Sequence, residues 1–466
     1  MPVRQLLSIK VLSTGQGPTE DPSKELAIEY PFSSQSIGGY AKVYATSSTA
    51  IDVEYYLDNV LISSAYTYRP NNPDLSTDQT TYWINDGVNT NTVSNGTHTI
   101  KVVGTYLNNI ISTRTRTITV DNTAPALPAV PTASNVSAPT LVVDSSITYP
   151  ITKTGPSTYT NETKTNVRYY DHVVRLAAGT AYEDVIEMFI PESVYTAGAA
   201  SAPTAVVWFV HGAGSSHASI QGGHNYHALC AVANGAIAIS CDFGGTLYSH
   251  PTAQRTLRNA YVYLENRFNI SKSFMRGTSH GGALSTYAYG QNLIPNLRGI
   301  MLGIGVYDIE EKTGNSAAVG VWSDPDDVPA SLRSAMVASG KWDGFMASSV
   351  YTAFGNDRNL AARNNPARLS RFNFANKTIR IFADNNPTPS LATYMNDMSN
   401  GQPTKPGDPI VDFQHHGNMF EQNVTLHGAP LPTSFNFSGS NEGHTESGIP
   451  DFSYWYIQML KNFINS

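Results

Sequence analysis

The pattern of apolar and polar positions divides the chain into two differently built parts. In the first 120 or so residues, apolar side chains alternate with polar ones over short runs, at 51–57, 96–104 and 115–120. Alternation with a period of two predicts strands that bury one face. Asp58-Asn59 follows the first run and favours a turn into residues 60–62. Short strands joined by turns predict a β-sandwich over residues 1–122.

The second part, residues 140–466, combines strand patterns with helical ones. Residues 173–176 and 185–190 are predicted to be antiparallel strands that lead into a central sheet. Residues 205–210 form a continuous apolar run, which is typical of a strand buried on both faces. Strands and helices then alternate, which predicts an α/β domain with a mostly parallel sheet flanked by helices. Apolar side chains recur at helical spacing at Leu257, Ala260, Tyr261, Leu264 and Phe268, and at Phe452, Trp455, Tyr456, Met459, Leu460 and Phe463.

Two segments stand apart from this order. Residues 123–139 are rich in Ala, Pro and Ser and are predicted to be a linker, so we expect the C-terminal part to fold without the N-terminal one. Residues 311–370 lie between two predicted strands. They form either an insertion that caps a pocket or ordinary helices that pack on the sheet.

Ser279 has the sequence context of an exposed nucleophile. It lies in Gly277-Thr278-Ser279-His280-Gly281, after a predicted strand at 273–276 and before a predicted helix at 283–289. A serine on a sharp strand-to-helix turn needs small residues two positions before and two after it, because larger side chains collide with the strand and helix. The strand–turn–helix context makes the spacing far more specific than the pattern alone.

A second small-residue loop follows the apolar run at 205–210. In His211-Gly212-Ala213-Gly214, backbone N–H groups are placed at a strand end, where they can point at a developing oxyanion. The N–H of His280, the residue after the serine, is the expected second donor. The alternative is a glycine-rich turn without a catalytic role.

His444 is the candidate general base. It lies in Gly443-His444-Thr445, after an alternating strand pattern around 434–437 and before the C-terminal helix. A histidine between the last strand and the last helix suits proton transfer from a serine on the same sheet edge. The alternative is a loop histidine with no role.

Taken together, these motifs resemble the α/β-hydrolase superfamily over residues from about 165 to 466. The resemblance rests on His211-Gly212-Ala213-Gly214, on Gly277-Thr278-Ser279-His280-Gly281 and on Gly443-His444. It implies Ser279 as nucleophile, His444 as base, and oxyanion donors near Gly212, Ala213 and His280. It also implies a serine esterase that needs no cofactor or metal.

The acid of the expected triad is Asp384, which follows the strand predicted at 378–383. The superfamily usually has a glycine soon after this strand and an aspartate beyond it, whereas this chain has Asn385-Asn386 there. Asp308, at the end of the preceding strand, is the alternative acid, and Asp397 and Asp412 are less favoured. The acid orients the histidine and stabilises its charged form, so an asparagine cannot replace it.

The N-terminal part resembles the immunoglobulin-like modules of bacterial surface and phage proteins. The resemblance rests on residues 95–100 and on Thr119-Val120-Asp121-Asn122. It implies a binding or spacing role, and with it a polymeric or surface-bound ester substrate such as an acylated glycan, a cell-wall ester or a polyester. Two other functions stay open: a peptidase of the same fold, and a non-catalytic surface or virion adhesion protein.

Composition narrows these functions. The chain has 466 residues, a net charge of −7 and only 14% charged residues, which speaks against a broad basic surface for nucleic acid. No apolar stretch reaches the length of a membrane span, and Lys10 interrupts the short apolar N-terminus, which does not fit a cleaved signal peptide. Because so low a share of charged residues is common in β-rich proteins outside cells, we expect an extracellular or virion-associated protein. Either its leader has been trimmed or it leaves the cell by lysis.

The remaining candidates for special chemistry are weak. Cys230 and Cys241 are expected to be buried free thiols rather than a disulfide. His217, His224 and His227 have no carboxylate or cysteine beside them, so they do not predict a zinc site. Asp242-Phe243-Gly244-Gly245 is interpreted as a turn that lines the pocket.

Overall fold

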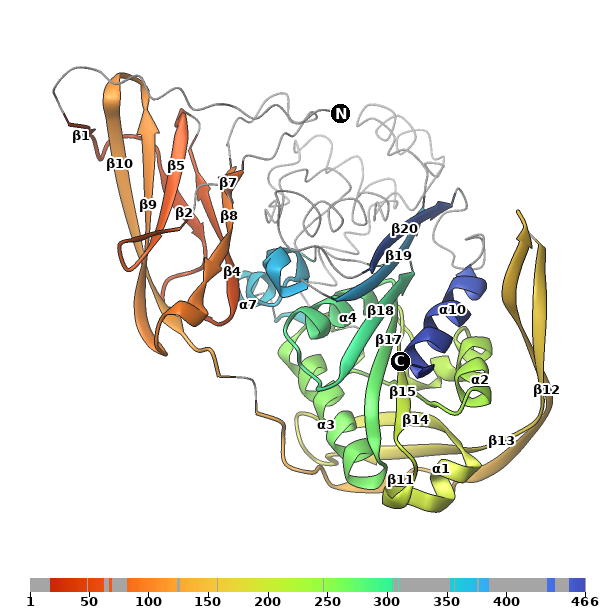
Figure 1. Ribbon diagram of the computed structural model, residues 1–466. Helices are drawn as coiled ribbons and strands as arrows, with labels where there is room; N and C mark the ends of the chain where they lie inside the picture. Colours follow the sequence, from red (N-terminus) through yellow and green to blue (C-terminus); the bar gives the residue numbers. More distant parts are fainter. Residues whose placement is uncertain are drawn as a thin grey trace, which may run out of the picture.

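The computed structural model has an all-β N-terminal domain and an α/β C-terminal domain (Figure 1). It describes residues 17–47, 49–62, 67–68, 82–123, 126–156, 158–245, 247–303, 305, 309, 353–355, 357–374, 377–384, 434–440 and 452–465. Most of the predicted insertion at 311–370 therefore lies outside the described residues.

The N-terminal domain consists of two sheets that share one core. One sheet has the order β1-β10-β9-β5-β6 with β3 beside β10, and the other has the order β2-β4-β8-β7. Inward-facing side chains from both sheets, such as Val43 and Val102, are fully buried in a single cluster. The predicted sandwich is thus present. Its strands are β1 (Thr19–Glu20), β2 (Ala27–Tyr30), β3 (Ser36–Ile37), β4 (Tyr40–Thr46), β5 (Asp52–Leu57), β6 (Val60–Ile62), β7 (Thr67–Tyr68), β8 (Tyr82–Asn89), β9 (Gly96–Tyr106) and β10 (Ile110–Val120).

The predicted turn between residues 51–57 and 60–62 is a two-residue hairpin. Asp58 and Asn59 have φ of 49° and 66°, and Leu57 pairs with Val60. Positive φ at both central positions matches the right-handed twist of the flanking strands, and Asp and Asn tolerate it better than most residues.

The C-terminal domain is built on a ten-stranded sheet with the order β11-β13-β14-β16-β15-β17-β18-β19-β20, in which β12 pairs with β13. Strands from β16 to β20 run parallel, and β11 to β14 are antiparallel, as the patterns at 173–176 and 185–190 predict. The strands are β11 (Ala133–Asn135), β12 (Thr140–Gly155), β13 (Thr158–Leu176), β14 (Asp184–Pro191), β15 (Thr204–Val210), β16 (Ile237–Cys241), β17 (Ile270–Thr278), β18 (Leu297–Gly303), β19 (Thr378–Asp384) and β20 (Ser434–Ser440).

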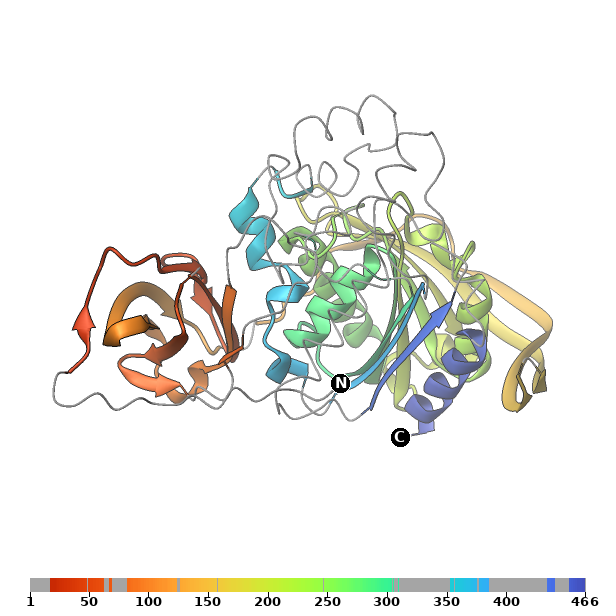
Figure 2. The same cartoon turned by 90° about the horizontal axis from the view of Figure 1, so that it is seen from above.

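Helices cover both faces of this sheet (Figures 1 and 2). The helices are α1 (Glu192–Ala197), α2 (Asn225–Ala233), α3 (Pro251–Arg267), α4 (Gly281–Gly290), α7 (Arg358–Arg363) and α10 (Phe452–Asn465), and short 3-10 helices include η5 (His217–Ile220), η7 (Pro366–Arg368) and η8 (Arg371–Phe374). Within the described residues, no helix combines the length and apolarity needed to cross a membrane.

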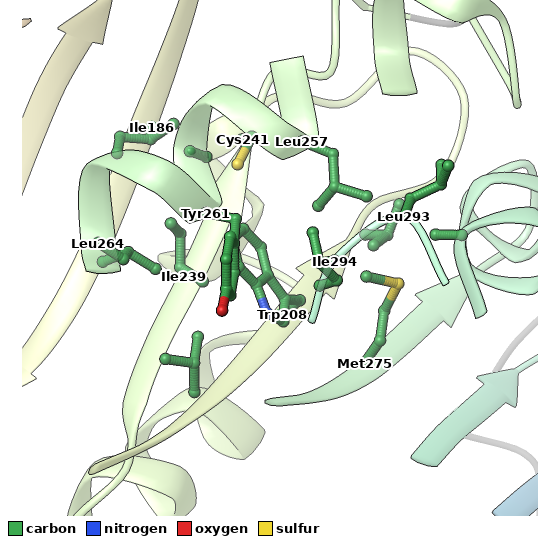
Figure 3. Close-up of a cluster of buried hydrophobic side chains, with 14 of the residues drawn as sticks. Ile186, Trp208, Ile239, Cys241, Leu257, Tyr261, Leu264, Met275, Leu293 and Ile294 are labelled. Atoms are coloured by element: carbon green, nitrogen blue, oxygen red, sulfur yellow. The ribbon is translucent and has the colours of Figure 1, made fainter. Parts of the chain in front are cut away.

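Burial on both faces explains why the sequence of strand β15 is apolar without alternation. Trp208 and its alternate neighbours pack under α3 and α4, together with Tyr261 and Met275 (Figure 3). Val207 and Phe209 face the opposite way and pack under α2 and α10. The central strand therefore buries both faces, which fixes it as the rigid support of the loop that follows it.

Both cysteines are buried free thiols, as the sequence predicts. Cys230 lies on α2, and Cys241 is the last residue of β16. Burial raises the pKa of the Cys230 thiol to about 12, so it is protonated at neutral pH and has little nucleophilic character.

The predicted linker contains a strand of the C-terminal sheet. Residues 133–135 form β11, which pairs with β13 from Ala133 opposite Leu176 to Asn135 opposite Val174. The Asn135 side chain also lies 2.9 Å from His172 Nε2. The last residues of the predicted linker are thus fixed to the α/β domain.

The two domains are in direct contact, through the segment at residues 366–374. The guanidinium of Arg368 lies 4.8 Å from the ring centre of Tyr30 and 4.9 Å from that of Tyr44. The ring of Tyr40 stacks on Phe372 with centres 4.9 Å apart, and Asn373 Nδ2 donates to the Tyr40 carbonyl oxygen at 3.1 Å. The N-terminal domain therefore packs on this segment of the α/β domain.

We predict that Arg368→Ala destabilises the protein at this contact. Arg368 is 8% exposed, and a desolvated cation–π contact is worth about 2 kcal/mol. Its loss is expected to lower the free energy of unfolding by about 2 kcal/mol, measured by chemical denaturation.

Arg363→Ala is the matched control for this substitution. Arg363 is exposed and lies 5.8 Å from the ring centre of Phe32, so its loss is expected to have less than half the effect. Equal stability of the Arg368→Ala variant and the wild-type protein would show that the contact does not hold the domains together.

Candidate active site

Ser279 lies at a strained turn between a strand and a helix. It lies between the last residue of β17 and the first residue of α4, and its φ is 52°. The left-handed region is unfavourable for a residue with a Cβ atom, so the surroundings must hold the turn. The Ser279 N–H donates to the Gly303 carbonyl at 3.1 Å, and the Gly282 N–H donates to the Ser279 carbonyl at 2.9 Å. This is the geometry that the sequence context predicts.

The glycines on either side of Ser279 are required by close packing. A Cβ atom on Gly281 would lie 2.3 Å from the Val210 carbonyl oxygen and 2.6 Å from that of His211. One on Gly277 would lie 2.5 Å from Ser285 Oγ and 2.8 Å from the Gly281 carbonyl oxygen. The first turn of α4 therefore sits directly against the end of β15, as the small residues in the motif predict.

The loop after β15 brings Gly212 next to the serine. A Cβ atom on Gly212 would lie 3.4 Å from Ser279 Cβ and 4.0 Å from Ser279 Oγ. Ala213 follows and is half-buried, and Gly214 has φ of 73°. The structure thus brings together Ser279 and the loop from which oxyanion donors are expected.

His280 contributes its backbone to the site and its side chain to the core. It caps the N-terminus of α4, where the first N–H groups have no carbonyl partner within the helix. Its ring is buried, with the rings of His211 and Tyr248 packed edgewise at centre distances of 5.5 and 5.3 Å. Burial and, to a smaller extent, the nearby His211 lower the pKa of His280 to about 3, so this imidazole is neutral and is not a general base at neutral pH.

The histidines that the sequence raised as metal candidates make other contacts. His224 Nε2 lies 3.2 Å from Thr278 Oγ1, directly before the serine, and His227 Nε2 lies 3.1 Å from Ser453 Oγ. Burial lowers the pKa of both imidazoles well below the usual value. Among the described residues, no group of three His, Cys, Asp or Glu side chains is placed to hold a metal ion.

The candidate acid lies at the end of the sheet where the parallel strands have their carboxyl ends. Asp384 is the last residue of β19 and pairs with Ser440, the last residue of β20. Across the parallel strands, Thr278 pairs with Gly303, and Gly303 with Phe382. With this register, Asp384 lies one position farther along its strand than Ser279 does. His444 and Asp308 lie outside the described residues.

Asp184 and Asp242 form a carboxylate pair at this edge. Sequence analysis placed Asp242 in a turn that lines the pocket and did not single out Asp184. Asp184 accepts hydrogen bonds from the N–H groups of Phe243 and Gly244 at 3.3 and 3.5 Å. Burial, and then the charge of Asp242, raise the pKa of Asp184 to about 7. The only sequence signal is the position of the two residues, Asp242 after one strand and Asp184 at the start of another.

Comparisons with known proteins find solved esterase structures at low similarity. No family model and no curated protein matches the chain. Carboxyl esterase 2 from the fungus Tuber melanosporum is 12% identical, with 64% of this chain and 86% of that chain covered at a TM-score of 0.40.

Two further solved esterase structures are similar to this chain at comparably low identity. A mutant of esterase Est22 is 10% identical and covers 70% of this chain and 81% of its own at a TM-score of 0.39. A ferulic acid esterase is 13% identical and covers 61% of this chain and 91% of its own at a TM-score of 0.30. At these scores the similarity says nothing about a shared substrate.

We predict that Gly281→Ala disrupts the turn at Ser279. The added methyl group meets two backbone oxygens at distances that no flexible side chain can relieve. Overpacking of this kind costs about 1–3 kcal/mol or more. The melting temperature is expected to fall clearly, or the turn to shift and Ser279 to lose its orientation. Gly223→Ala, where an added Cβ meets nothing within 4 Å, should leave the melting temperature unchanged.

We predict that Asp184 makes stability fall as pH rises. Its pKa of about 7 in the folded protein is above the ordinary value of 3.8, so the folded state holds a proton that the unfolded state has lost between those values. The stabilising effect is complete below pH 3.8 and is lost as pH rises through 7.

Asp184→Asn, which mimics the protonated acid, tests this pH dependence. Between pH 5 and 8, the wild-type protein should lose on the order of 2–3 kcal/mol of unfolding free energy relative to this variant. Denaturant titrations at both pH values measure the difference. Identical pH dependence of the two proteins would contradict the raised pKa.

Proposed function

We propose that the chain is a serine hydrolase that cleaves carboxylic ester bonds. Ser279 is the nucleophile, His444 the general base and Asp384 the acid, with Asp308 as the alternative acid. The observation that supports this most directly is the left-handed turn at Ser279, packed against the loop that contains Gly212. A serine held in this way presents its hydroxyl at the carboxyl edge of a parallel sheet, with backbone N–H groups close by.

The proposed reaction has two displacement steps. His444 accepts the Ser279 proton as Oγ bonds to the ester carbonyl carbon, and the carbonyl electrons move onto its oxygen. The N–H groups of Gly212, Ala213 and His280 stabilise this oxyanion. The carbonyl re-forms as the alcohol leaves with the proton from His444, and water attacks the acyl-enzyme by the same route to release the acid. No step needs a metal or cofactor.

The choice of Asp384 over Asp308 is supported by the sheet register. Asp384 pairs with Ser440, and His444 follows Ser440 by four residues in the sequence. A triad acid accepts from the imidazole Nδ1 of its histidine, so the proposal needs an acid and a histidine that follow neighbouring strand ends.

The substrate class is proposed from the domain organisation. A two-sheet β domain attached to a hydrolase suits a polymeric or surface-bound ester, such as an acylated glycan, a cell-wall ester or a polyester. We propose that this domain is an immunoglobulin-like binding module and that the protein works outside cells or on a virion. A peptidase of the same fold and a non-catalytic adhesion protein are the alternatives that the experiments below distinguish.

Covalent labelling tests the nucleophile. A fluorophosphonate probe is expected to label the wild-type protein once, and Ser279→Ala is expected to abolish the label and to lower ester hydrolysis about a thousandfold or more. Mass spectrometry of the labelled peptide identifies the serine. Absence of labelling in the folded wild-type protein would favour the adhesion protein.

Ser273→Ala is the matched control for the labelling experiment. Ser273 is buried on the strand that leads to Ser279, and its Oγ has no hydrogen-bond partner among the described residues, so the label should persist. A panel of p-nitrophenyl esters and peptide anilides then separates an esterase from a peptidase.

Paired substitutions test the acid. Asp384→Asn is expected to lower kcat by about 10³–10⁴-fold, because the asparagine favours the wrong tautomer of the histidine. Asp308→Asn is the control and should have a mild effect. A crippling effect of Asp308→Asn with a mild effect of Asp384→Asn would assign the acid to the preceding strand.

A further inference from the structure

The loop that carries the proposed oxyanion donors is short and is bounded by two histidines. The chain leaves β15 at Val210, passes His211, Gly212 and Ala213, and enters η5 at His217. The proposed mechanism assigns no role to either histidine side chain. Both of them contact one residue on the neighbouring strand end, Asp242.

Asp242 holds both ends of this loop. Its Oδ1 accepts a hydrogen bond from the backbone N–H of His217 at 2.8 Å and lies 2.7 Å from His217 Nδ1. Its carbonyl oxygen lies 3.2 Å from His211 Nε2, and His211 Nδ1 lies 2.8 Å from the Gly212 carbonyl oxygen. A single residue therefore connects the start and the end of the loop to β16.

The segment after the loop is anchored at three further points. Ser219 Oγ lies 3.0 Å from Ser240 Oγ on β16. Gln221 Nε2 donates to Asp171 Oδ2 at 2.7 Å and to Glu187 Oε1 at 2.9 Å, on β13 and β14. With these contacts and the contact of His224 with Thr278, residues 217–224 are fixed to the sheet, so a displacement of the loop must begin at its Asp242 contacts.

The charges around Asp242 favour an ion pair with His217. Burial works against the ionised form of Asp242, but hydrogen bonds from His217 outweigh it and keep the pKa of the carboxyl below its usual value. The hydrogen bond that His217 donates to Asp242 is the main reason that the pKa of His217 is raised, and the charges of Asp242, Glu187 and Asp184 add to it. At neutral pH the Asp242 carboxylate thus accepts two hydrogen bonds from His217, one from its backbone N–H and one from its imidazole.

We infer that Asp242 is a positioning residue for the oxyanion hole, which it serves by fixing the backbone of Gly212 and Ala213 beside Ser279. This inference rests on the proposed function. Oxyanion donors accelerate a reaction only when they are already aimed at the charge that develops, and a misplacement of about 1 Å can cost about 10²-fold in rate. The Asp242 side chain acts through His217, and its backbone carbonyl contacts His211.

The expected signature is a loss in kcat without a loss in substrate binding. In Asp242→Ala, kcat for a p-nitrophenyl ester should fall about 10- to 100-fold while KM changes by less than about threefold, because the donors bind the transition state more strongly than the substrate. Asp242→Asn keeps an oxygen that accepts from the His217 N–H and should recover most of the activity. His217→Ala, which keeps its backbone N–H, should lie between the two.

Glu183→Ala is the matched control. The Glu183 carboxylate also accepts a backbone N–H, that of Gly179 at 2.8 Å, and pairs with Arg175 in the same domain. Its removal should leave kcat unchanged. Hydrogen exchange of the His217 amide, measured by mass spectrometry of the peptide that contains it, should be faster in Asp242→Ala than in the wild-type and Glu183→Ala proteins.

The outcomes separate this inference from the proposed function. Wild-type protein that neither labels with fluorophosphonate nor cleaves esters overturns both. Wild-type protein that labels at Ser279, with unchanged kcat in the Asp242→Ala and His217→Ala variants, overturns the positioning role alone. If Asp242→Ala does not fold, His217→Ala decides, and full activity of that variant would overturn the positioning role.

Discussion

The close approach of helix α4 to the end of strand β15 is the constraint on which the rest of the candidate site depends. Gly281 lies so near the Val210 and His211 carbonyl oxygens that no side chain fits there. This contact sets where α4 begins, and with it the left-handed turn at Ser279 and the position of the His280 N–H. The strain of that turn is offset by a helix and a strand that are each packed on both sides.

Polar side chains reinforce the same edge of the sheet, in addition to the apolar packing of Ile220. Asp242, Ser240 and Thr278 each bind the segment at residues 217–224 from a different place on β16 or β17. Hydrogen-bonded contacts of this kind fix direction as well as distance, which apolar contacts do not. That distinction matters for a loop whose backbone N–H groups must point at one atom of a substrate.

Two neighbouring residues of the α/β domain link the N-terminal domain to helix α4. Arg368 lies against Tyr30 and Tyr44 of the N-terminal domain, and the neighbouring Leu369 packs on Gly290 at the end of α4. The segment that carries both residues leads directly into β19, the strand that ends at Asp384. The β domain therefore contacts the part of the chain that supports the candidate acid, which a flexible tether would not do.

The sequence alone determined the elements and the steric needs of the turn. The apolar run at 205–210 predicted a strand buried on both faces, and the glycines around Ser279 predicted a tight turn, because both predictions follow from local pattern and backbone geometry. The contacts of Arg368 with Tyr30, of Asp242 with His217, and the raised pKa of Asp184 were decided by the tertiary structure. Each joins residues far apart in the chain, and burial and neighbouring charge exist only once the chain has folded.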